Sequence, residues 1–140
     1  MIQVIMGIKG SGKTKRLIDL ANDAVKVEHG NVVFIDDDKR YMYDLKHQIR
    51  FINAGDYALG EHRSRDWFYG LLGGILAANH DISIVYVDAF MRLINNKDYS
   101  ELQPLFEKLE TLSKDNDANF VISVSGDPED LPEFIKNYAV

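Results

Sequence analysis

Gly7-Ile8-Lys9-Gly10-Ser11-Gly12-Lys13-Thr14 is the stretch that decides the fold of this chain. The apolar run Ile2-Gln3-Val4-Ile5-Met6 precedes it and has the length and β-branched content of a buried parallel strand. After it, apolar residues recur at helical spacing from Leu17 to Val25. A strand, a glycine-rich turn and a helix in this order predict a βα unit at the start of the chain.

The residue types of this stretch suit the binding of phosphate groups. Gly7, Gly10 and Gly12 allow the backbone to curl with its N–H groups pointing inward. These N–H groups and the start of the next helix together form a site for an anion. Lys13 brings a positive charge to the β- and γ-phosphates of a nucleotide, and the Thr14 hydroxyl can bind Mg²⁺.

We expect eight residues of this stretch and its end to bind the nucleotide: Gly7, Lys9, Gly10, Ser11, Gly12, Lys13, Thr14 and Lys15. Lys9 either adds charge near the phosphates or faces water. The alternative for the whole stretch is a glycine-rich turn with a surface lysine. The predicted strand before it and helix after it favour the phosphate site.

Length and composition are typical of a folded protein, and we expect one nucleotide-binding domain over residues 1–140. The chain has 46% hydrophobic and 27% charged residues and a formal net charge of −6. This charge disfavours a general binder of nucleic acid or anionic membranes. The absence of cysteine excludes disulfides and thiol catalysis, and with no membrane segment in the sequence we expect a cytoplasmic protein.

Further strands are predicted at residues 32–35, 49–52, 82–87 and 120–124, and further helices at residues 66–79 and around residues 102–112. Strands that alternate with helices predict an α/β fold, a three-layer α/β/α sandwich around a mostly parallel sheet. We expect Gly30 to end the first helix in a left-handed conformation and a last short helix to open at Asp127. Ser100 and Gln103 resemble a capping box; the alternative is that Pro104 delays the start of the helix by a turn.

Two segments are less regular. Residues 54–65 predict a mobile loop. Gly70, Gly73 and Gly74 weaken the helix at residues 66–79, and such glycines usually let a neighbouring element approach closely. We expect that helix to pack on the sheet; the alternative is a helix that binds a partner.

Asp88 ends the strongest apolar run, at residues 82–87. With this aspartate and the stretch at residues 7–14, the chain resembles the P-loop NTPase superfamily, in its Walker B and Walker A motifs respectively. The resemblance implies that Lys13 and Asp88 act in catalysis. It also implies that Thr14 and Asp88 hold Mg²⁺. The alternative for Asp88, compatible with this one, is a helix N-cap.

The resemblance also narrows the choice of nucleotide and raises the question of which residue activates the attacking water. The guanine motif of common GTPases is absent, so we expect ATP or another NTP rather than GTP. Ala89 stands where many such ATPases have a glutamate that activates water. Asp36, Asp37 and Asp38 could supply a base or a metal ligand at the end of a strand. The alternative is a solvated turn before a helix around residues 41–47.

Other polar residues have both a functional and an ordinary interpretation. Ser123 and Ser125 end the last strand, where many such ATPases sense the γ-phosphate, or they are ordinary strand-end hydroxyls. Arg63 and Arg65 either reach a phosphate, including that of a neighbouring subunit, or lie in a solvated loop. His29, His47, His62 and His80 have no pair at metal-ligand spacing.

The order of motifs also resembles the core of type II thymidine kinases, without their glutamate or cysteine-bound zinc lobe. The Walker A motif resembles that of pilus-retraction and secretion motor ATPases, which are much longer. We therefore expect a Mg²⁺-dependent ATP-binding protein, a slow NTPase that could act as a homo-oligomer. The alternatives are a nucleotide-dependent sensor that binds other proteins, and a small-molecule kinase with residues 54–65 as its lid.

Overall fold

Strands and helices alternate along residues 1–140, all of which the computed structural model describes. The strands are β1 (Ile2–Gly7), β2 (Asn31–Asp36), β3 (Arg50–Asn53), β4 (Ile82–Val87) and β5 (Asn119–Ser125). The helices are α1 (Lys13–Ala24), α2 (Arg65–Ala78), α3 (Phe90–Leu93), α4 (Gln103–Asn116) and α5 (Glu133–Lys136). Short 3-10 helices lie at η1 (Met42–Asp44), η2 (Ala54–Tyr57) and η3 (Tyr99–Glu101).

The strands form one five-stranded sheet in the order β1-β5-β4-β2-β3, and every neighbouring pair is parallel. The expectation of an α/β fold around a mostly parallel sheet is confirmed. Parallel strands end at the same edge of a sheet, so Gly7, Asp36, Asp88 and Ser125 come to one edge. The strand β5 lies between β1 and β4, although the chain reaches it last.

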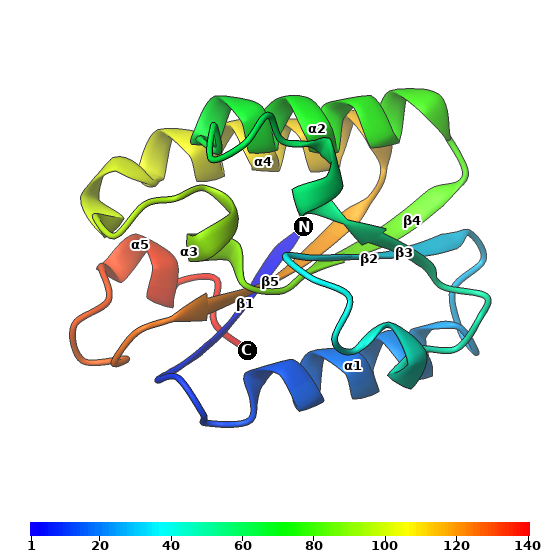
Figure 1. Ribbon diagram of the computed structural model, residues 1–140, viewed down its shortest axis with the longest axis horizontal. Helices are drawn as coiled ribbons and strands as arrows, with labels where there is room; N and C mark the ends of the chain where they lie inside the picture. The colour runs from blue at the N-terminus through cyan, green and yellow to red at the C-terminus, as the bar shows by residue number, and fades with distance from the viewer.

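Helices cover both faces of the sheet, an arrangement compatible with a three-layer sandwich. Figure 1 shows α2 and α4 on one face and α1 on the other. The larger core contains Phe68 of α2 and Phe106 of α4, and the smaller core contains Leu17 and Ile18 of α1. Side chains of β2 alternate between these two cores, as a strand buried on both faces requires.

Three expected helix ends are wrong. The helix α1 ends at Ala24, and Gly30 has no left-handed φ; a side chain at Gly30 would instead collide with the Asp81 carbonyl. No capping box forms at Ser100, whose N–H and hydroxyl both donate to the Asp98 carboxylate, and Pro104 lies in the first turn of α4. The last helix begins at Glu133 rather than at Asp127.

Two further segments differ from expectation. Only the short helix η1 forms within residues 41–47. The segment at residues 54–64 is not an unattached loop, because its Arg63 bonds to Asp37 and its Tyr57 carbonyl accepts from the Trp67 indole.

The glycines of α2 do not serve the close approach that the sequence suggested. A Cβ atom added at Gly70, Gly73 or Gly74 would meet nothing within 4 Å. The contacts of α2 with the core come instead from larger side chains on its other side, among them Phe68 and Leu72. No helix of the structure combines the length and apolar character needed to cross a membrane.

Candidate functional site

The turn between β1 and α1 is fixed by three glycines. Gly10 and Gly12 have left-handed φ angles of 84° and 91°, which side-chain-bearing residues rarely adopt. Gly7 packs closely against Ser11, because an added Cβ atom would force the Ser11 hydroxyl to move. The Ser11 N–H donates to the Ile8 carbonyl oxygen at 3.1 Å and closes the turn. The N–H groups at the start of α1 have no side-chain cap, since the N-cap residue is Gly12.

Lys13 opens α1 and folds back over this turn. Its Nζ donates to the Ile8 carbonyl oxygen at 2.9 Å. Burial lowers the pKa of the Lys13 ammonium from its ordinary value, while the nearby Asp88 carboxylate acts in the opposite direction. The ammonium group is therefore held between the turn and the end of β4.

Asp88 follows β4 and is 6% exposed. The Thr14 hydroxyl donates to its Oδ2 at 2.8 Å, and the Ser123 hydroxyl donates to its Oδ1 at 2.7 Å. Ser123 also accepts from the Ala89 N–H at 3.2 Å. Asp88 is not the N-cap of α3: that position is Ala89, at a left-handed φ of 56° and with no side-chain cap. The Asp88 carboxylate is thus held by strand β5 and by the start of α1.

Asp36 is the most buried carboxylate at this edge of the sheet, at 2% exposure. Its Oδ1 accepts from the Asp37 N–H at 2.6 Å. Burial raises the pKa of Asp36 to about 7 against that hydrogen bond, with the negative charges of Asp88 and Asp38 adding to the rise. The alternative of a fully solvated turn is therefore wrong for Asp36.

Asp37 joins two segments to the sheet edge. It is 17% exposed and pairs with Arg63 at 2.5 Å and with Arg92 of α3 at 3.2 Å. Arg63 is thus occupied within the protein, and Arg65 donates to the Glu101 carbonyl. The expectation of a solvated loop is wrong for Arg63, and neither Arg63 nor Arg65 lines the cavity described next.

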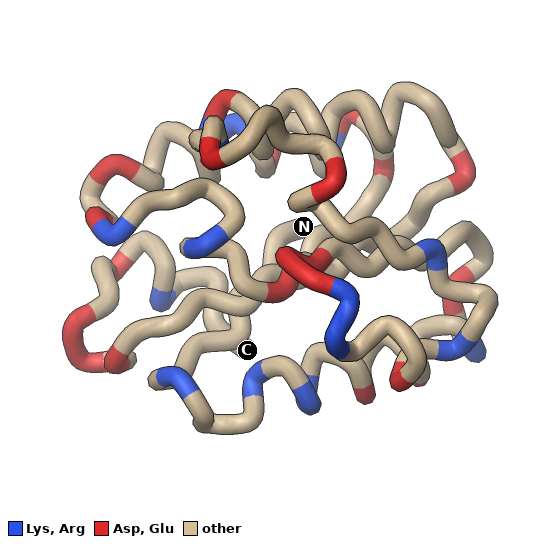
Figure 2. The backbone as a smooth tube through the Cα atoms, in the orientation of Figure 1, with Lys and Arg blue, Asp and Glu red and all other residues tan.

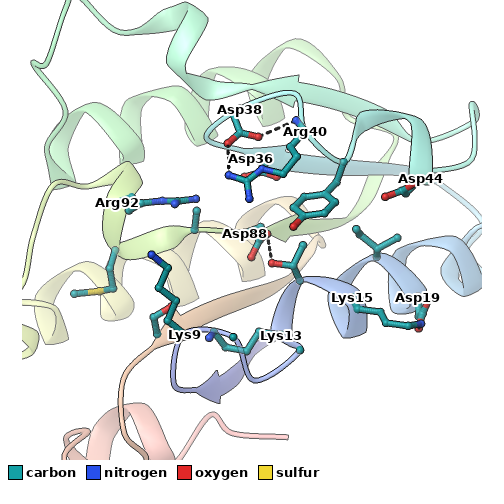
Figure 3. Close-up of a pocket in the computed structure, with 18 of the residues that line it drawn as sticks. Lys9, Lys13, Lys15, Asp19, Asp36, Asp38, Arg40, Asp44, Asp88 and Arg92 are labelled. Carbon is teal, nitrogen blue, oxygen red and sulfur yellow. Dashed lines mark hydrogen bonds and ion pairs between the residues drawn. The ribbon is translucent and has the colours of Figure 1, made fainter.

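A cavity of about 920 Å³ lies at the carboxyl edge of the sheet, near the upper end of the roughly 300–1,000 Å³ typical of small-molecule sites. Figure 3 shows Lys9 and Lys13 at one end, Asp88 near the middle, and Asp19 and Asp44 at the other end. Figure 2 shows acidic positions gathered after β2 and basic positions around the turn that follows β1. The lining residues are Lys9, Gly10, Gly12, Lys13, Thr14, Lys15, Ile18, Asp19, Asn22, Asp36, Asp38, Arg40, Tyr41, Asp44, Asp88, Ala89, Met91, Arg92 and Ser125.

The cavity brings together most of the residues that the sequence singled out. Gly7 and Ser11 are the two expected nucleotide-binding residues outside its lining. Ser125 lines it, and the Ser125 carbonyl accepts from the Tyr99 hydroxyl at 2.6 Å. None of the four histidines lines it, and no group of three or more His, Cys, Asp or Glu side chains is arranged to hold a metal ion.

Neither a protein-family model nor a curated protein sequence matches this chain.

Sequence reasoning missed the far end of the cavity. Tyr41 and Asp44 line that end, and sequence reasoning also missed Arg92, which lines the cavity on the side of Lys9 (Figure 3). None of the three stands in a recognisable motif. Arg92 lies four residues after Asp88, a spacing that would bring both to one side of a helical turn. That spacing is the one sequence signal that marks Arg92 as a site residue; no pattern in the sequence marks Tyr41 or Asp44.

Proposed function

We propose that this chain is a Mg²⁺-dependent ATP-binding protein of the P-loop NTPase type that transfers the γ-phosphoryl group to water. One observation carries the proposal: Lys9, Gly10 and Gly12 of the turn at residues 8–12 line the same cavity as the Thr14–Asp88 pair. Neither feature alone would be specific, because glycine turns and strand-end aspartates are both common. The function requires that Thr14, just after the turn, and Asp88, just after β4, lie in contact, although 74 positions separate them in the sequence.

Polyphosphate binding follows from the geometry of the turn. The left-handed φ angles of Gly10 and Gly12 are those that let a turn present its backbone N–H groups to an anion, and the uncapped start of α1 adds N–H groups of its own. Lys13 is the mobile positive charge of the site, and the Ile8 carbonyl that it now contacts is easily exchanged for a phosphate oxygen.

The donor set beside this turn suits Mg²⁺. One hydroxyl and one carboxylate, at 2.8 Å from each other, leave the remaining positions to water and phosphate oxygens, as Mg²⁺ prefers. Thr14 and Asp88 would hold the ion, which when bound neutralises charge on the β- and γ-phosphates. The Ser123 bond keeps the second Asp88 oxygen in place.

Asp36 is the carboxylate that we assign as the base for water. The water oxygen bonds to the γ-phosphorus as the bond from that phosphorus to the β–γ bridging oxygen breaks. ADP leaves with that electron pair, and the water proton passes to Asp36. Asp36 lines the cavity, and its pKa of about 7 suits a general base at neutral pH. It can therefore accept the proton that the methyl side chain of Ala89 cannot accept.

Calorimetry with Mg-ATP, followed by phosphate release, tests the proposal. We expect Lys13→Ala to lose about 30-fold to 150-fold in affinity, because a charge-assisted contact to phosphate contributes about 2–3 kcal/mol. Lys26→Ala, at an exposed lysine in the turn just beyond α1, is the control and should bind normally. Asp36→Asn should keep its affinity and lose about 100-fold in phosphate release. Failure of the wild-type chain to bind millimolar nucleotide would end the proposal.

A nucleotide-dependent sensor is the second candidate, favoured by Ala89 in place of a glutamate and by the Asp37 bridge. Arg92 lines the cavity and shares Asp37 with Arg63, so a bound phosphate that attracts Arg92 would loosen the segment at residues 54–64. ATP that stays intact for hours while the protease-cleavage pattern of the chain changes would identify a sensor. Steady phosphate release would identify an NTPase.

A further inference from the structure

Arg92 lies in the short helix α3, which begins two residues after the end of β4 and is fixed by the larger core. Phe90 and Leu93 of this helix are both buried there. The Phe90 ring packs edge-on against Phe68 and Phe106, with centroids 5.4 Å and 5.8 Å apart. Arg92 does not join that core: its side chain is 57% exposed and lines the cavity. The packing of α3 therefore determines where Arg92 meets the cavity.

The backbone turns sharply between Asp88 and this helix. Ala89 has a left-handed φ of 56°, a conformation that is unfavourable for residues other than glycine. The Ala89 N–H donates to the Ser123 hydroxyl at 3.2 Å, so β5 holds the turn. Unfavourable backbone conformations persist where the surrounding structure fixes them, and they are concentrated at functional sites. Here the turn brings Arg92 to the same cavity as Asp88, the carboxylate that would hold Mg²⁺.

The Arg92 guanidinium is anchored on one side only. Its Nε lies 3.2 Å from the Asp37 Oδ2, and Asp37 is itself paired with Arg63. The two Nη groups of Arg92 form no hydrogen bond or ion pair within the protein. A guanidinium presents its donors as a planar fork that matches two oxygens of one phosphate group. Arg92 is therefore oriented by Asp37 and keeps its fork free for an anion.

The other cations of the cavity differ from Arg92 in this respect. Lys15 and Arg40 are each paired with a carboxylate of their own segment, at 3.1 Å and 3.4 Å. Lys13 belongs to the phosphate turn, where it donates to a backbone carbonyl. Figure 3 shows Lys9 and Arg92 reaching into the same part of the cavity from the turn and from α3. Since like charges repel, an anion between these two side chains would be strongly favoured.

Asp36 indicates which phosphate group would lie beside Arg92. Burial raises the pKa of Asp36 to about 7, and the positive charge of Arg92 opposes that rise, so the two side chains are close enough to interact. In the proposed function Asp36 accepts the proton of the water that attacks the γ-phosphorus. The γ-phosphate must then lie near Asp36, and therefore on the side of the cavity that Arg92 lines.

We propose that Arg92 selects a nucleoside triphosphate over a diphosphate, by donating from its free Nη groups to oxygens of the γ-phosphate. Lys9 adds positive charge on the same side. ADP has no γ-phosphate to make these contacts, so it binds more weakly and can leave after hydrolysis. This role rests on the proposed function, because it adds a specificity-determining residue to the same site.

Calorimetry with Mg²⁺ and either ADP or a nonhydrolysable ATP analogue tests the inference. We expect the full chain to bind the analogue at least about tenfold more tightly than ADP. Arg92→Gln should reduce this ratio to about twofold or less and change the affinity for ADP by less than about twofold. Arg92→Lys, which keeps the charge and loses the fork, should have an intermediate ratio.

Arg50→Gln is the matched control, because it removes the same charge from an exposed arginine outside the cavity lining. Arg50 opens β3, at the opposite edge of the sheet, and the variant should keep the wild-type ratio. Urea unfolding checks that each variant is folded. If Arg92→Gln does not fold, Arg92→Lys decides the test, and a wild-type ratio in that variant would overturn the inference.

Three further results would overturn it and leave the proposed function standing. The wild type could bind the analogue and ADP equally well, or Arg92→Gln could keep the wild-type ratio. Arg92→Gln could also lose affinity for both ligands alike, which is the result expected if Arg92 only supports the fold. Failure of the wild type to bind either ligand at millimolar concentration would instead end the proposed function, and the role of Arg92 with it.

Discussion

Two segments line opposite sides of the cavity, and they are built in different ways. The turn at residues 8–12 offers backbone N–H groups, because Gly10 and Gly12 hold left-handed φ angles of 84° and 91°. The acidic segment at residues 36–44 offers carboxylates whose positions depend on partners elsewhere, such as Asn22 on α1 and Arg92 on α3. The first property is local in sequence and the second is assembled by the fold, so the two can be altered independently.

The largest expected effect comes from the backbone of the turn. Gly12→Val places a β-branched residue at a φ of 91°, which costs on the order of 1–3 kcal/mol. The turn should relax and lose its array of N–H groups, so we expect Mg-ATP affinity to fall about 100-fold or more. Calorimetry measures this loss.

Gly60→Val is the matched control for this variant. Gly60 also has a left-handed φ, 61°, and open space around it, but it lies outside the cavity lining. The Gly60→Val variant should lose about as much stability as Gly12→Val and should retain its affinity for Mg-ATP. Equal loss of affinity in both variants would mean that general destabilisation, and not the shape of the turn, explains the effect.

The next effect is the pH dependence of Asp36, in the acidic segment. Its pKa in the folded chain is about 7, above the ordinary value of 3.8, so the folded state binds more protons than the unfolded state between these values. The stability of the wild type should therefore fall as pH rises from about 4 to 7, by up to about 1.4 kcal/mol per unit from this group.

Urea unfolding at pH 5 and pH 7 measures this dependence. Asp36→Asn removes the titrating group, so the wild type should lose more stability between these pH values than the variant does. The same pH dependence in both proteins would show that Asp36 is ionised throughout and that its burial carries little cost.

Much of the fold follows from patterns within short windows of the sequence. The apolar run at residues 82–87 predicts β4, and the strand–turn–helix order at the start of the chain predicts β1, the glycine turn at residues 8–12 and α1. The bond of Ser123 to Asp88 could not be predicted, because it depends on β5 lying between β1 and β4. Chain order alone does not specify that insertion.

Other residues that line the cavity show the same limit more strongly. Helix α3, which carries Arg92, has four residues and is too short for a periodic pattern. Asp44 enters the cavity because the Asn22 side chain holds its backbone, a contact between segments that no motif marks. The wrong assignment of Gly30 has a similar origin, since the nearby Asp81 carbonyl, and not a left-handed φ, excludes a side chain there.

A smaller effect is expected at Asp37, which ties the acidic segment to two neighbours. Asp37→Asn keeps the size of the side chain and removes the charge that pairs with Arg63 and Arg92. We expect a loss of about 1–2 kcal/mol in the free energy of unfolding, since the side chain is only 17% exposed. Urea unfolding measures it.

Asp38→Asn serves as the control, because that carboxylate is 44% exposed and its single pair with Arg40 spans 3.4 Å. Its loss should lie within about 0.5 kcal/mol. Proteolysis at residues 54–64 should rise in the Asp37 variant alone. If the Asp37 variant is as stable and as protease-resistant as the Asp38 variant, the ion pairs of Asp37 with Arg63 and Arg92 do not stabilise the fold.

The smallest effect contrasts Gly126, which is closely packed just after β5, with Gly70, a glycine that its helix does not need. Gly70 is exposed on α2 and an added Cβ atom would meet nothing, so Gly70→Ala should stabilise the chain by about 0.5–1 kcal/mol. Gly126→Ala should destabilise it, because the added atom would lie 2.6 Å from the Tyr99 hydroxyl oxygen. Urea unfolding at two protein concentrations measures both. A Gly70→Ala variant that is less stable, and increasingly so at higher concentration, would mean that a second copy of the chain covers α2, as in the homo-oligomer that the sequence left open for a slow NTPase.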